Sequence, residues 1–125
     1  MKTILIIEDE KNLAFLLGQV LKMSDYEVIW AQDALMGTKY AHEKKPDLII
    51  LDVMLPAGGG LAVLKNLALS FDTFSIPVVI YTGMEDDEFK EKILAYNIAA
   101  YLQKPSDMKV IVETVDKILK KQPAK

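Results

Sequence analysis

The sequence predicts a single α/β domain in which five strands and five helices alternate as (βα)5 units around one parallel sheet. Two observations predict this fold class. Short apolar runs recur along the chain, and several are continuous rather than alternating, which is typical of strands that helices bury on both faces. Longer segments between these runs carry apolar residues at helical spacing. The strict alternation of the two kinds of segment favours a doubly wound domain.

The expected strands are five short segments rich in isoleucine, valine and leucine. They span residues 4–7, 26–30, 48–51, 77–81 and 99–102. Helical spacing is clear in three of the intervening segments, which are residues 13–21, 61–67 and 108–119. Ser106 or Asp107 is the expected N-cap of the last helix, because both side chains accept hydrogen bonds from free backbone amides.

The composition indicates one soluble globular domain. The chain has 125 residues, of which 51% are hydrophobic and 26% are charged. We expect the domain to span residues 1–121, with 122–125 as a tail or the start of a linker. The formal net charge of −3 provides no electrostatic reason to expect direct nucleic-acid binding.

The cysteine count and the apolar segments bear on location. Because the chain has no cysteine, disulfides and thiolate metal sites are excluded and a reducing compartment fits. The apolar run at the N-terminus is too short for a signal peptide and meets Glu8-Asp9-Glu10 directly. No apolar stretch has the length of a membrane span. We therefore expect a cytoplasmic protein that does not bind membranes.

Polar residues follow four of the five expected strands. Glu8-Asp9-Glu10 follows the first strand, Asp52 the third, Thr82 the fourth and Lys104-Pro105 the fifth. In open α/β sheets the functional crevice lies beyond the carboxyl ends of the strands. These carboxylates, the hydroxyl and the ammonium are therefore expected to converge at one edge of the sheet.

Convergent carboxylates imply a cation. Two unit negative charges about 4 Å apart repel by about 4 kcal/mol at an effective dielectric of about 20. A cluster of oxygen ligands without histidine or cysteine suits Mg²⁺ better than zinc. Asp52 ends a strongly apolar strand, and a rigidly held carboxylate can attack phosphorus to form an aspartyl phosphate. The metal, Lys104 and Thr82 would each neutralise or bind one phosphoryl oxygen.

These residues resemble the signature of response regulator receiver domains of two-component signal transduction, including the chemotaxis-regulator type. The matching motifs are Glu8-Asp9, Asp52 with Met54-Leu55-Pro56, Thr82-Gly83, Lys104-Pro105, Pro56 with Gly60 in the loop after the strand that ends at Asp52, and Tyr101 three residues before the lysine. The resemblance extends from Lys2 to about Leu119. It implies a flavodoxin-like sheet with strand order 2-1-3-4-5.

The resemblance also implies the chemistry of the site. Asp52 would take its phosphoryl group from a phosphohistidine on a sensor histidine kinase or a histidine phosphotransfer protein. Mg²⁺, or Mn²⁺, would be held directly by Asp9 and Asp52. Glu8 would act through a water molecule, and Met54 through its backbone carbonyl.

Further implications concern the switch. Lys104 would contact a phosphoryl oxygen, and the Lys104-Pro105 bond would be cis. Thr82 would move toward the phosphoryl group and Tyr101 would turn inward behind it. This movement would reshape the surface of the fourth helix, fifth strand and fifth helix. The domain would thus be a signalling switch that catalyses only its own phosphorylation and slow dephosphorylation.

Some positions depart from the usual pattern of this family. Gly58-Gly59-Gly60 is richer in glycine than expected, which predicts a looser loop. Met54 and Met84 stand two residues after the acceptor and two after the threonine. Because neither side chain can position an attacking water by hydrogen bonds, we predict a long-lived phosphoryl group.

Each motif alone has an ordinary structural explanation, such as helix capping by Glu8-Asp9-Glu10. A haloacid-dehalogenase-like phosphohydrolase would need an aspartate where Met54 stands, and a flavin-binding module would not place acids after the first strand. A receiver-like interaction domain that acts without phosphorylation stays open as the alternative. The choice between a single-domain regulator and part of a longer one, with a downstream effector or an output domain, also stays open, as does a phosphorylation-dependent homodimer.

Overall fold

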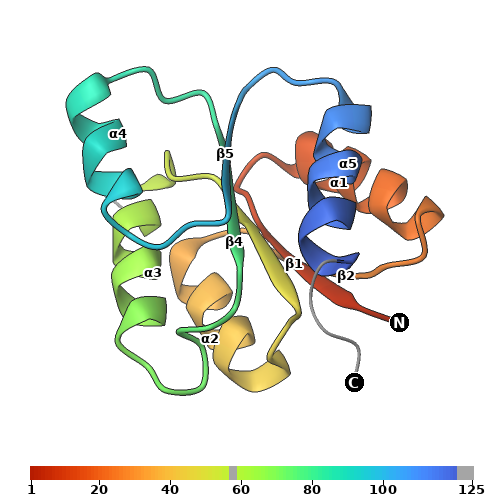
Figure 1. Ribbon diagram of the computed structural model, residues 1–125, viewed down its shortest axis with the longest axis horizontal. Coiled ribbons are helices and arrows are strands. Elements are labelled where there is room, and N and C mark those ends of the chain that lie inside the picture. The colour runs from red at the N-terminus through yellow and green to blue at the C-terminus, as the bar shows by residue number, and fades with distance from the viewer. Residues whose placement is uncertain (57–58, 121–125) are drawn as a thin grey trace.

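The computed structural model describes residues 1–56 and 59–120. The expected tail at 122–125 and the end of the domain at 121 lie outside these residues. The elements follow one another as β1 (Thr3–Ile7), α1 (Lys11–Met23), β2 (Glu27–Ala31), α2 (Ala34–Lys44), β3 (Leu48–Leu51), α3 (Gly59–Ala68), β4 (Val78–Thr82), α4 (Asp87–Leu94), β5 (Ala100–Gln103) and α5 (Met108–Lys120). They form one sheet with helices on both sides (Figure 1).

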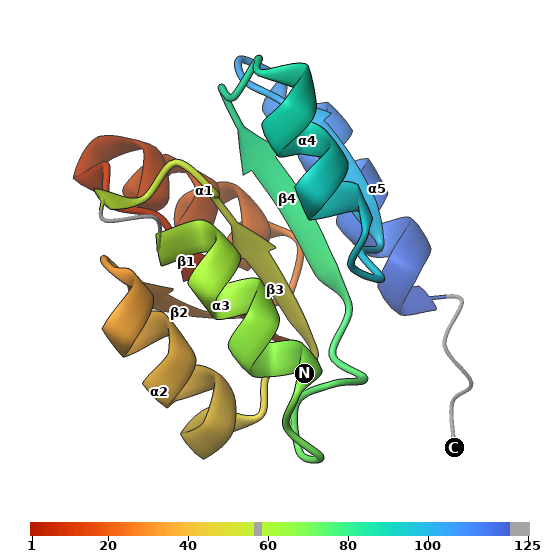
Figure 2. The same cartoon turned by 90° about the vertical axis from the view of Figure 1, so that its left-hand side faces the viewer.

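All strand pairs are parallel, and their order is β2-β1-β3-β4-β5. The predicted fold class and strand order are therefore confirmed. The predicted strands differ from the observed ones by one residue at most at either end, and the third strand has the predicted limits. In Figure 2, α2, α3 and α4 lie on the near side of the sheet, while α1 and α5 lie behind it.

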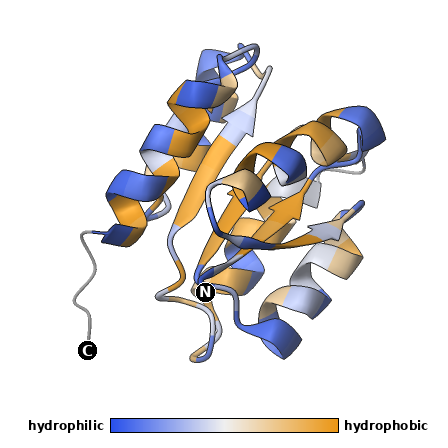
Figure 3. Cartoon of the chain, turned by 90° about the vertical axis from the view of Figure 1, so that its right-hand side faces the viewer, coloured by the Kyte–Doolittle hydropathy of each residue, from blue (hydrophilic) through white to orange (hydrophobic). Residues whose placement is uncertain are grey.

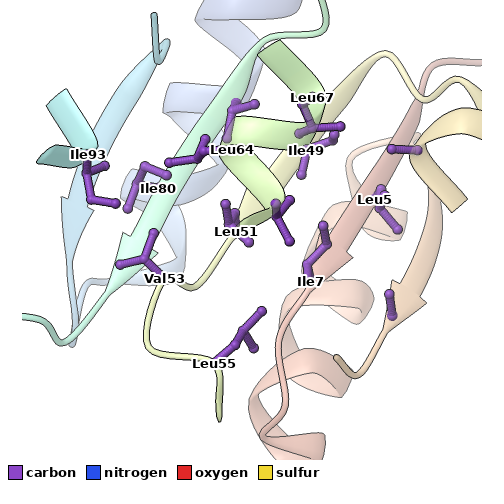
Figure 4. Close-up of a cluster of buried hydrophobic side chains, with 14 residues drawn as sticks. Leu5, Ile7, Ile49, Leu51, Val53, Leu55, Leu64, Leu67, Ile80 and Ile93 are labelled. Carbon is purple, nitrogen blue, oxygen red and sulfur yellow. The ribbon is translucent and has the colours of Figure 1, made fainter. Parts of the chain in front are cut away.

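The continuous apolar strands β1 and β3 separate two hydrophobic cores. Alternate side chains of a strand point to opposite faces. Leu5 and Ile49 thus join the cluster under α2, α3 and α4, part of which is drawn in Figure 4. Ile6 and Ile50 join the second cluster, under α1 and α5. The outer faces of the helices carry most of the hydrophilic residues (Figure 3).

Acidic side chains begin four of the helices. The carboxylates of Glu10, Asp33 and Asp86 accept hydrogen bonds from the first turns of α1, α2 and α4. At α5 the capping residue is Asp107, whose Oδ1 lies 2.9 Å from the backbone nitrogen of Lys109. The run 85–88 is thus a helix start, as its composition suggests.

The glycines after the acceptor strand have a packing role. Gly58 lies outside the described residues, but Gly59 and Gly60 are the first residues of α3 and not part of a loose loop. A Cβ atom on Gly60 would lie 2.3 Å from the Cα atom of Val53. Only glycine therefore allows α3 to start so close to the end of β3. This packing helps to hold the segment that follows Asp52.

None of the described helices has both the length and the apolar character that a bilayer crossing requires.

Candidate functional site

The carboxyl ends of β1 and β3 bring three acidic residues together. The two strands are adjacent, with Ile7 opposite Leu51, and each is followed by its acidic residues. Carboxylate oxygens of Glu8, Asp9 and Asp52 lie within 4.8 Å of one another. Glu8 and Asp52 are buried, whereas Asp9 is exposed. The convergence expected from the sequence is therefore present.

Asp52 is held by donors on both of its oxygens. Its side chain is buried, with only 6% of the residue exposed. Oδ1 accepts hydrogen bonds from the Thr82 hydroxyl at 2.7 Å and from the Met54 backbone amide at 2.9 Å. Oδ2 accepts a hydrogen bond from the Lys104 ammonium at 2.8 Å. The carboxylate thus has a single orientation, with a hydroxyl and an ammonium at its two ends.

Lys104 connects two of the buried acids. Its Nζ lies 2.9 Å from Oε1 of Glu8 as well as 2.8 Å from Asp52. The backbone continues the β4–β5 ladder, since the Lys104 amide donates to the Thr82 carbonyl at 2.8 Å, and the Lys104–Pro105 bond is cis. Burial disfavours the charged lysine, but the hydrogen bonds and charges of Asp52 and Glu8 outweigh it and raise the pKa of Lys104. The ammonium therefore stays charged at neutral pH.

Glu8 shows the electrostatic cost of this arrangement. Burial raises the pKa of its carboxyl above the ordinary value, although hydrogen bonds from Lys104 and the Glu10 amide partly offset the effect. Within the described part of the chain, Lys104 is the one cation that forms ion pairs with this cluster. Three carboxylates with one ammonium leave an excess of negative charge. This donor set of hard oxygens fits a divalent cation such as Mg²⁺ or Mn²⁺.

The two predicted switch residues already face the interior. The Thr82 hydroxyl contacts Asp52 directly, and it also accepts a hydrogen bond from the Met84 amide at 3.3 Å. Tyr101, on the neighbouring strand β5, buries its hydroxyl without a hydrogen-bond partner among the residues described. Lys90 of α4 lies over the Tyr101 ring, 4.7 Å from its centroid. An unpaired buried hydroxyl costs about 1–3 kcal/mol, which opposes the inward position of this ring.

The two methionines differ in their surroundings. Met54 is 53% exposed beside Asp52, which its amide contacts. Met84 packs against the hydrophobic core under α3 and α4. The role of the Met54 carbonyl as a metal ligand and the consequence of both methionines for hydrolysis stay predictions.

Trp30 is a site neighbour that the sequence reasoning missed. The sequence predicts it only as the last residue of the second strand, whereas its indole N–H donates to the Glu8 backbone carbonyl at 2.8 Å. The pairing of β1 with β2 brings these residues together, although 22 positions separate them. No local pattern in the sequence could have indicated the contact.

Comparison with known proteins identifies the family. The sequence model of the response regulator receiver domain matches residues 4–116. This chain belongs to that family. The predicted family is thus confirmed, and the chain is a receiver domain of a two-component response regulator, a signalling switch and not a classical enzyme.

Two curated relatives of this receiver domain are transcriptional or response regulators. The alkaline phosphatase synthesis transcriptional regulatory protein PhoP of Bacillus subtilis (strain 168) is 38% identical over 122 residues, which cover 96% of this chain and 49% of PhoP. Response regulator ArlR of Staphylococcus aureus (strain Mu50 / ATCC 700699) is 36% identical over 125 residues, which cover 100% of this chain and 56% of ArlR. The receiver domain therefore spans about half the length of these relatives.

Solved structures agree with this assignment. The Mn(2+)-bound form of response regulator Rcp1 superposes on the receiver domain with a TM-score of 0.86 and 27% identity. The match covers 100% of this chain and 99% of that chain.

Proposed function

We propose that this receiver domain is switched by phosphorylation of Asp52. An oxygen of Asp52 forms a bond to phosphorus while the phosphorus–nitrogen bond of a donor phosphohistidine breaks. The released imidazole nitrogen takes up a proton. The observation that carries the proposal is the buried Asp52 carboxylate, which has the Thr82 hydroxyl 2.7 Å away and the Lys104 ammonium 2.8 Å away. Both groups are positioned to bind phosphoryl oxygens once one of the Asp52 oxygens is esterified.

The roles of these two groups follow from the charge that the reaction develops. The transition state of phosphoryl transfer spreads negative charge over three equatorial oxygens. The Lys104 ammonium can neutralise one oxygen because the lysine is already protonated at neutral pH. Asp52 and Glu8 raise its pKa against the effect of burial. The Thr82 hydroxyl can donate to another. Thr82 ends β4, and Lys104 directly follows the neighbouring strand β5, where its amide donates to the Thr82 carbonyl. Little reorganisation is therefore needed during the reaction.

We infer that Glu8, Asp9 and Asp52 hold a divalent cation, with the Met54 carbonyl as a further ligand. Three carboxylate oxygens within 4.8 Å support this site, as does the Mn(2+)-bound form of the structural relative Rcp1. Mg²⁺ is the proposed physiological ion. When bound, it supplies positive charge to the third phosphoryl oxygen. Asp9 is the exposed member, through which the ion would enter.

The proposed output is a change in the surface formed by α4, β5 and α5. In the β4–β5 pair, Thr82 lies opposite Gln103 and Tyr101 lies opposite Ile80. Thr82 and Tyr101 are thus two residue pairs apart at the end of these neighbouring strands. A phosphoryl group that binds Thr82 would keep the Thr82 side chain next to Asp52. The space that the Tyr101 ring fills would then stay free of the Thr82 side chain. Phosphorylation would thus stabilise the inward position of Tyr101 by making the alternative position of Thr82 less favourable.

The proposed partners follow from the family. A sensor histidine kinase or a histidine phosphotransfer protein would donate the phosphoryl group, and an effector or an output domain would receive the signal. The greater length of PhoP and ArlR supports an output domain in a longer protein. A homodimer after phosphorylation and a cytoplasmic location are further parts of this proposal, and the acidic domain itself would not bind nucleic acid.

The test is the intact mass of the protein after incubation with acetyl phosphate, with and without Mg²⁺. We expect the gain of one phosphoryl group in the wild type only with metal, and no gain in Asp52→Asn. A gain that persists in Asp52→Asn would show that another residue is the acceptor. No gain under any condition would favour the alternative, a receiver-like interaction domain that acts without phosphorylation.

A further inference from the structure

We propose that Trp30 is a positioning residue for the acidic cluster, and that it acts through the peptide unit that joins Glu8 to Asp9. The inference rests on the proposed metal site. The proposed role of Trp30 involves no contact with the ion. Instead, its indole N–H fixes the backbone from which two of the three acidic side chains extend.

The backbone amide and the backbone carbonyl of Glu8 both form hydrogen bonds with residues of β2. The regular β1–β2 ladder ends with Ile7 opposite Ala31, and the Glu8 amide then donates to the Ala31 carbonyl at 3.1 Å. The Glu8 carbonyl accepts from the Trp30 indole at 2.8 Å. This carbonyl belongs to the planar Glu8–Asp9 peptide unit. The direction of this carbonyl therefore sets the orientation of the Glu8–Asp9 peptide plane, and with it the position of the Asp9 Cα atom.

Asp9 depends on this backbone more than its neighbours do. Across the described chain, the side-chain hydrogen bonds and ion pairs of the cluster hold Glu8 and Asp52 and do not involve the Asp9 carboxylate. Asp9 is also the exposed member of the three. Among the described residues, a rotation of the Glu8–Asp9 peptide would thus displace Asp9 without breaking a hydrogen bond or ion pair of its carboxylate. The Trp30 hydrogen bond resists that rotation.

The position of Trp30 indicates that its hydrogen bond matters more than its burial. It lies on the edge strand β2 and is 36% exposed, so its ring contributes less to the core than a buried tryptophan would. Outer hydrogen bonds that orient metal ligands commonly change metal affinity by about 10- to 100-fold when removed. Because Trp30 holds a ligand's backbone and not its carboxylate, we expect a smaller effect.

The experiment compares Mg²⁺ binding with stability in three proteins. Trp30→Phe keeps an aromatic ring and loses the N–H donor. Val28→Ala is the matched control, since Val28 lies on the same strand and packs against the core under α1 and α5. Isothermal titration calorimetry gives the Kd for Mg²⁺, and urea unfolding gives the stability of each protein.

We expect Trp30→Phe to raise the Kd for Mg²⁺ about fivefold, which is about 1 kcal/mol at 1.4 kcal/mol per tenfold. Val28→Ala should leave the Kd unchanged even where it lowers stability as much as Trp30→Phe does. An unchanged Kd in a folded Trp30→Phe protein would overturn the role of Trp30 and leave the metal site in place. A wild type that binds no Mg²⁺ would overturn the proposed metal site, and this inference with it.

A second measurement does not depend on the folding of any variant. Trp30 is the only tryptophan of the chain, so wild-type emission reports on this residue alone. We expect the emission to change during a Mg²⁺ titration with the same midpoint as the calorimetric binding curve. Emission that stays constant while calorimetry detects binding would also overturn the proposal, because the indole would then not be coupled to the site.

Discussion

Substitution of Lys104 by methionine tests the charge balance of the site. The change removes the ammonium from between Asp52 and Glu8, which lie 2.8 Å and 2.9 Å from it, and keeps a side chain of similar length. Both acids stay buried, with 6% and 2% exposed. Their carboxylates, within 4.8 Å of each other, would then face each other without a compensating charge.

The expected size of the effect follows from opposing terms. Each ion pair has a Coulomb energy of about 6 kcal/mol at an effective dielectric of about 20, but dehydration of the charges offsets most of it. Removing one partner of a buried pair typically destabilises a protein by about 3–5 kcal/mol. The Lys104 side chain is 21% exposed. We therefore expect a loss near the lower end, about 3 kcal/mol in the free energy of unfolding without metal.

The assay is urea unfolding of the wild type and Lys104→Met, with and without Mg²⁺. A cation that binds only the folded state adds about 2.7 kcal/mol at 100 times its Kd, so Mg²⁺ at that level should bring Lys104→Met close to the stability of the metal-free wild type. Lys92→Met is the control, because Lys92 is exposed and forms no ion pair within the described ranges. Its stability should change little.

The pH dependence provides a further check on this reasoning. The pKa of Glu8 is raised by burial, so its carboxylate disfavours folding above that pKa, and the penalty disappears as the pH falls below the unfolded value of 4.5. The deficit of Lys104→Met should therefore shrink as the pH is lowered from 7 towards 4.5. A metal-free Lys104→Met protein as stable as the wild type at neutral pH would refute the idea that this cluster carries uncompensated negative charge.

Three further results are expected. His42 is the only histidine, and its hydrogen bonds to Asn66 and Asp72 raise its pKa, so its contribution to stability is present below pH 6.5 and lost as the pH rises through the folded pKa. A proton NMR titration should show a lower pKa in Asp72→Asn, and an unchanged pKa would contradict the contact. Gly60→Ala places a Cβ atom 2.3 Å from the backbone of the residue after Asp52. It should lower the free energy of unfolding in urea by about 3 kcal/mol. A near-neutral result would mean that α3 can shift freely. Met54→Asn should shorten the lifetime of the phosphoryl group several-fold, because an amide beside Asp52 can position water. The lifetime is measured by intact mass as the decay of the phosphorylated protein. An unchanged lifetime would show that the methionine does not limit hydrolysis.

Local patterns predicted most of the fold because the sheet is buried on both faces. Residues 48–51 form a continuous apolar run that became β3 with the same limits. The clear helical spacing likewise predicts α1, α3 and α5. The elements α2 and α4 were expected only from the alternation of units, since the buried residues of α2 are the small Gly37 and Ala41 and the buried residue of α4 is Ile93 alone.

The site was predictable for a topological reason. Parallel strands end at the same edge, so Asp52, Thr82 and Lys104 could be placed together from their positions after apolar runs. The contacts that cross between elements far apart in sequence were not predictable. Tyr26, which the sequence predicts as the first residue of the second strand, lies just before β2. Its hydroxyl donates to Asp116 on α5, 90 positions away.

The sequence by itself thus determined the alternation of strands and helices and the set of chemical groups at the strand ends, because periodicity and chain order are local properties. The tertiary structure alone decided which donor meets which acceptor. The indole of Trp30 reaches Glu8, and the ammonium of Lys104 lies between Glu8 and Asp52, because strand register and helix packing bring these groups within hydrogen-bonding distance. Such short-range forces depend on tenths of an ångström, which only the packed chain specifies.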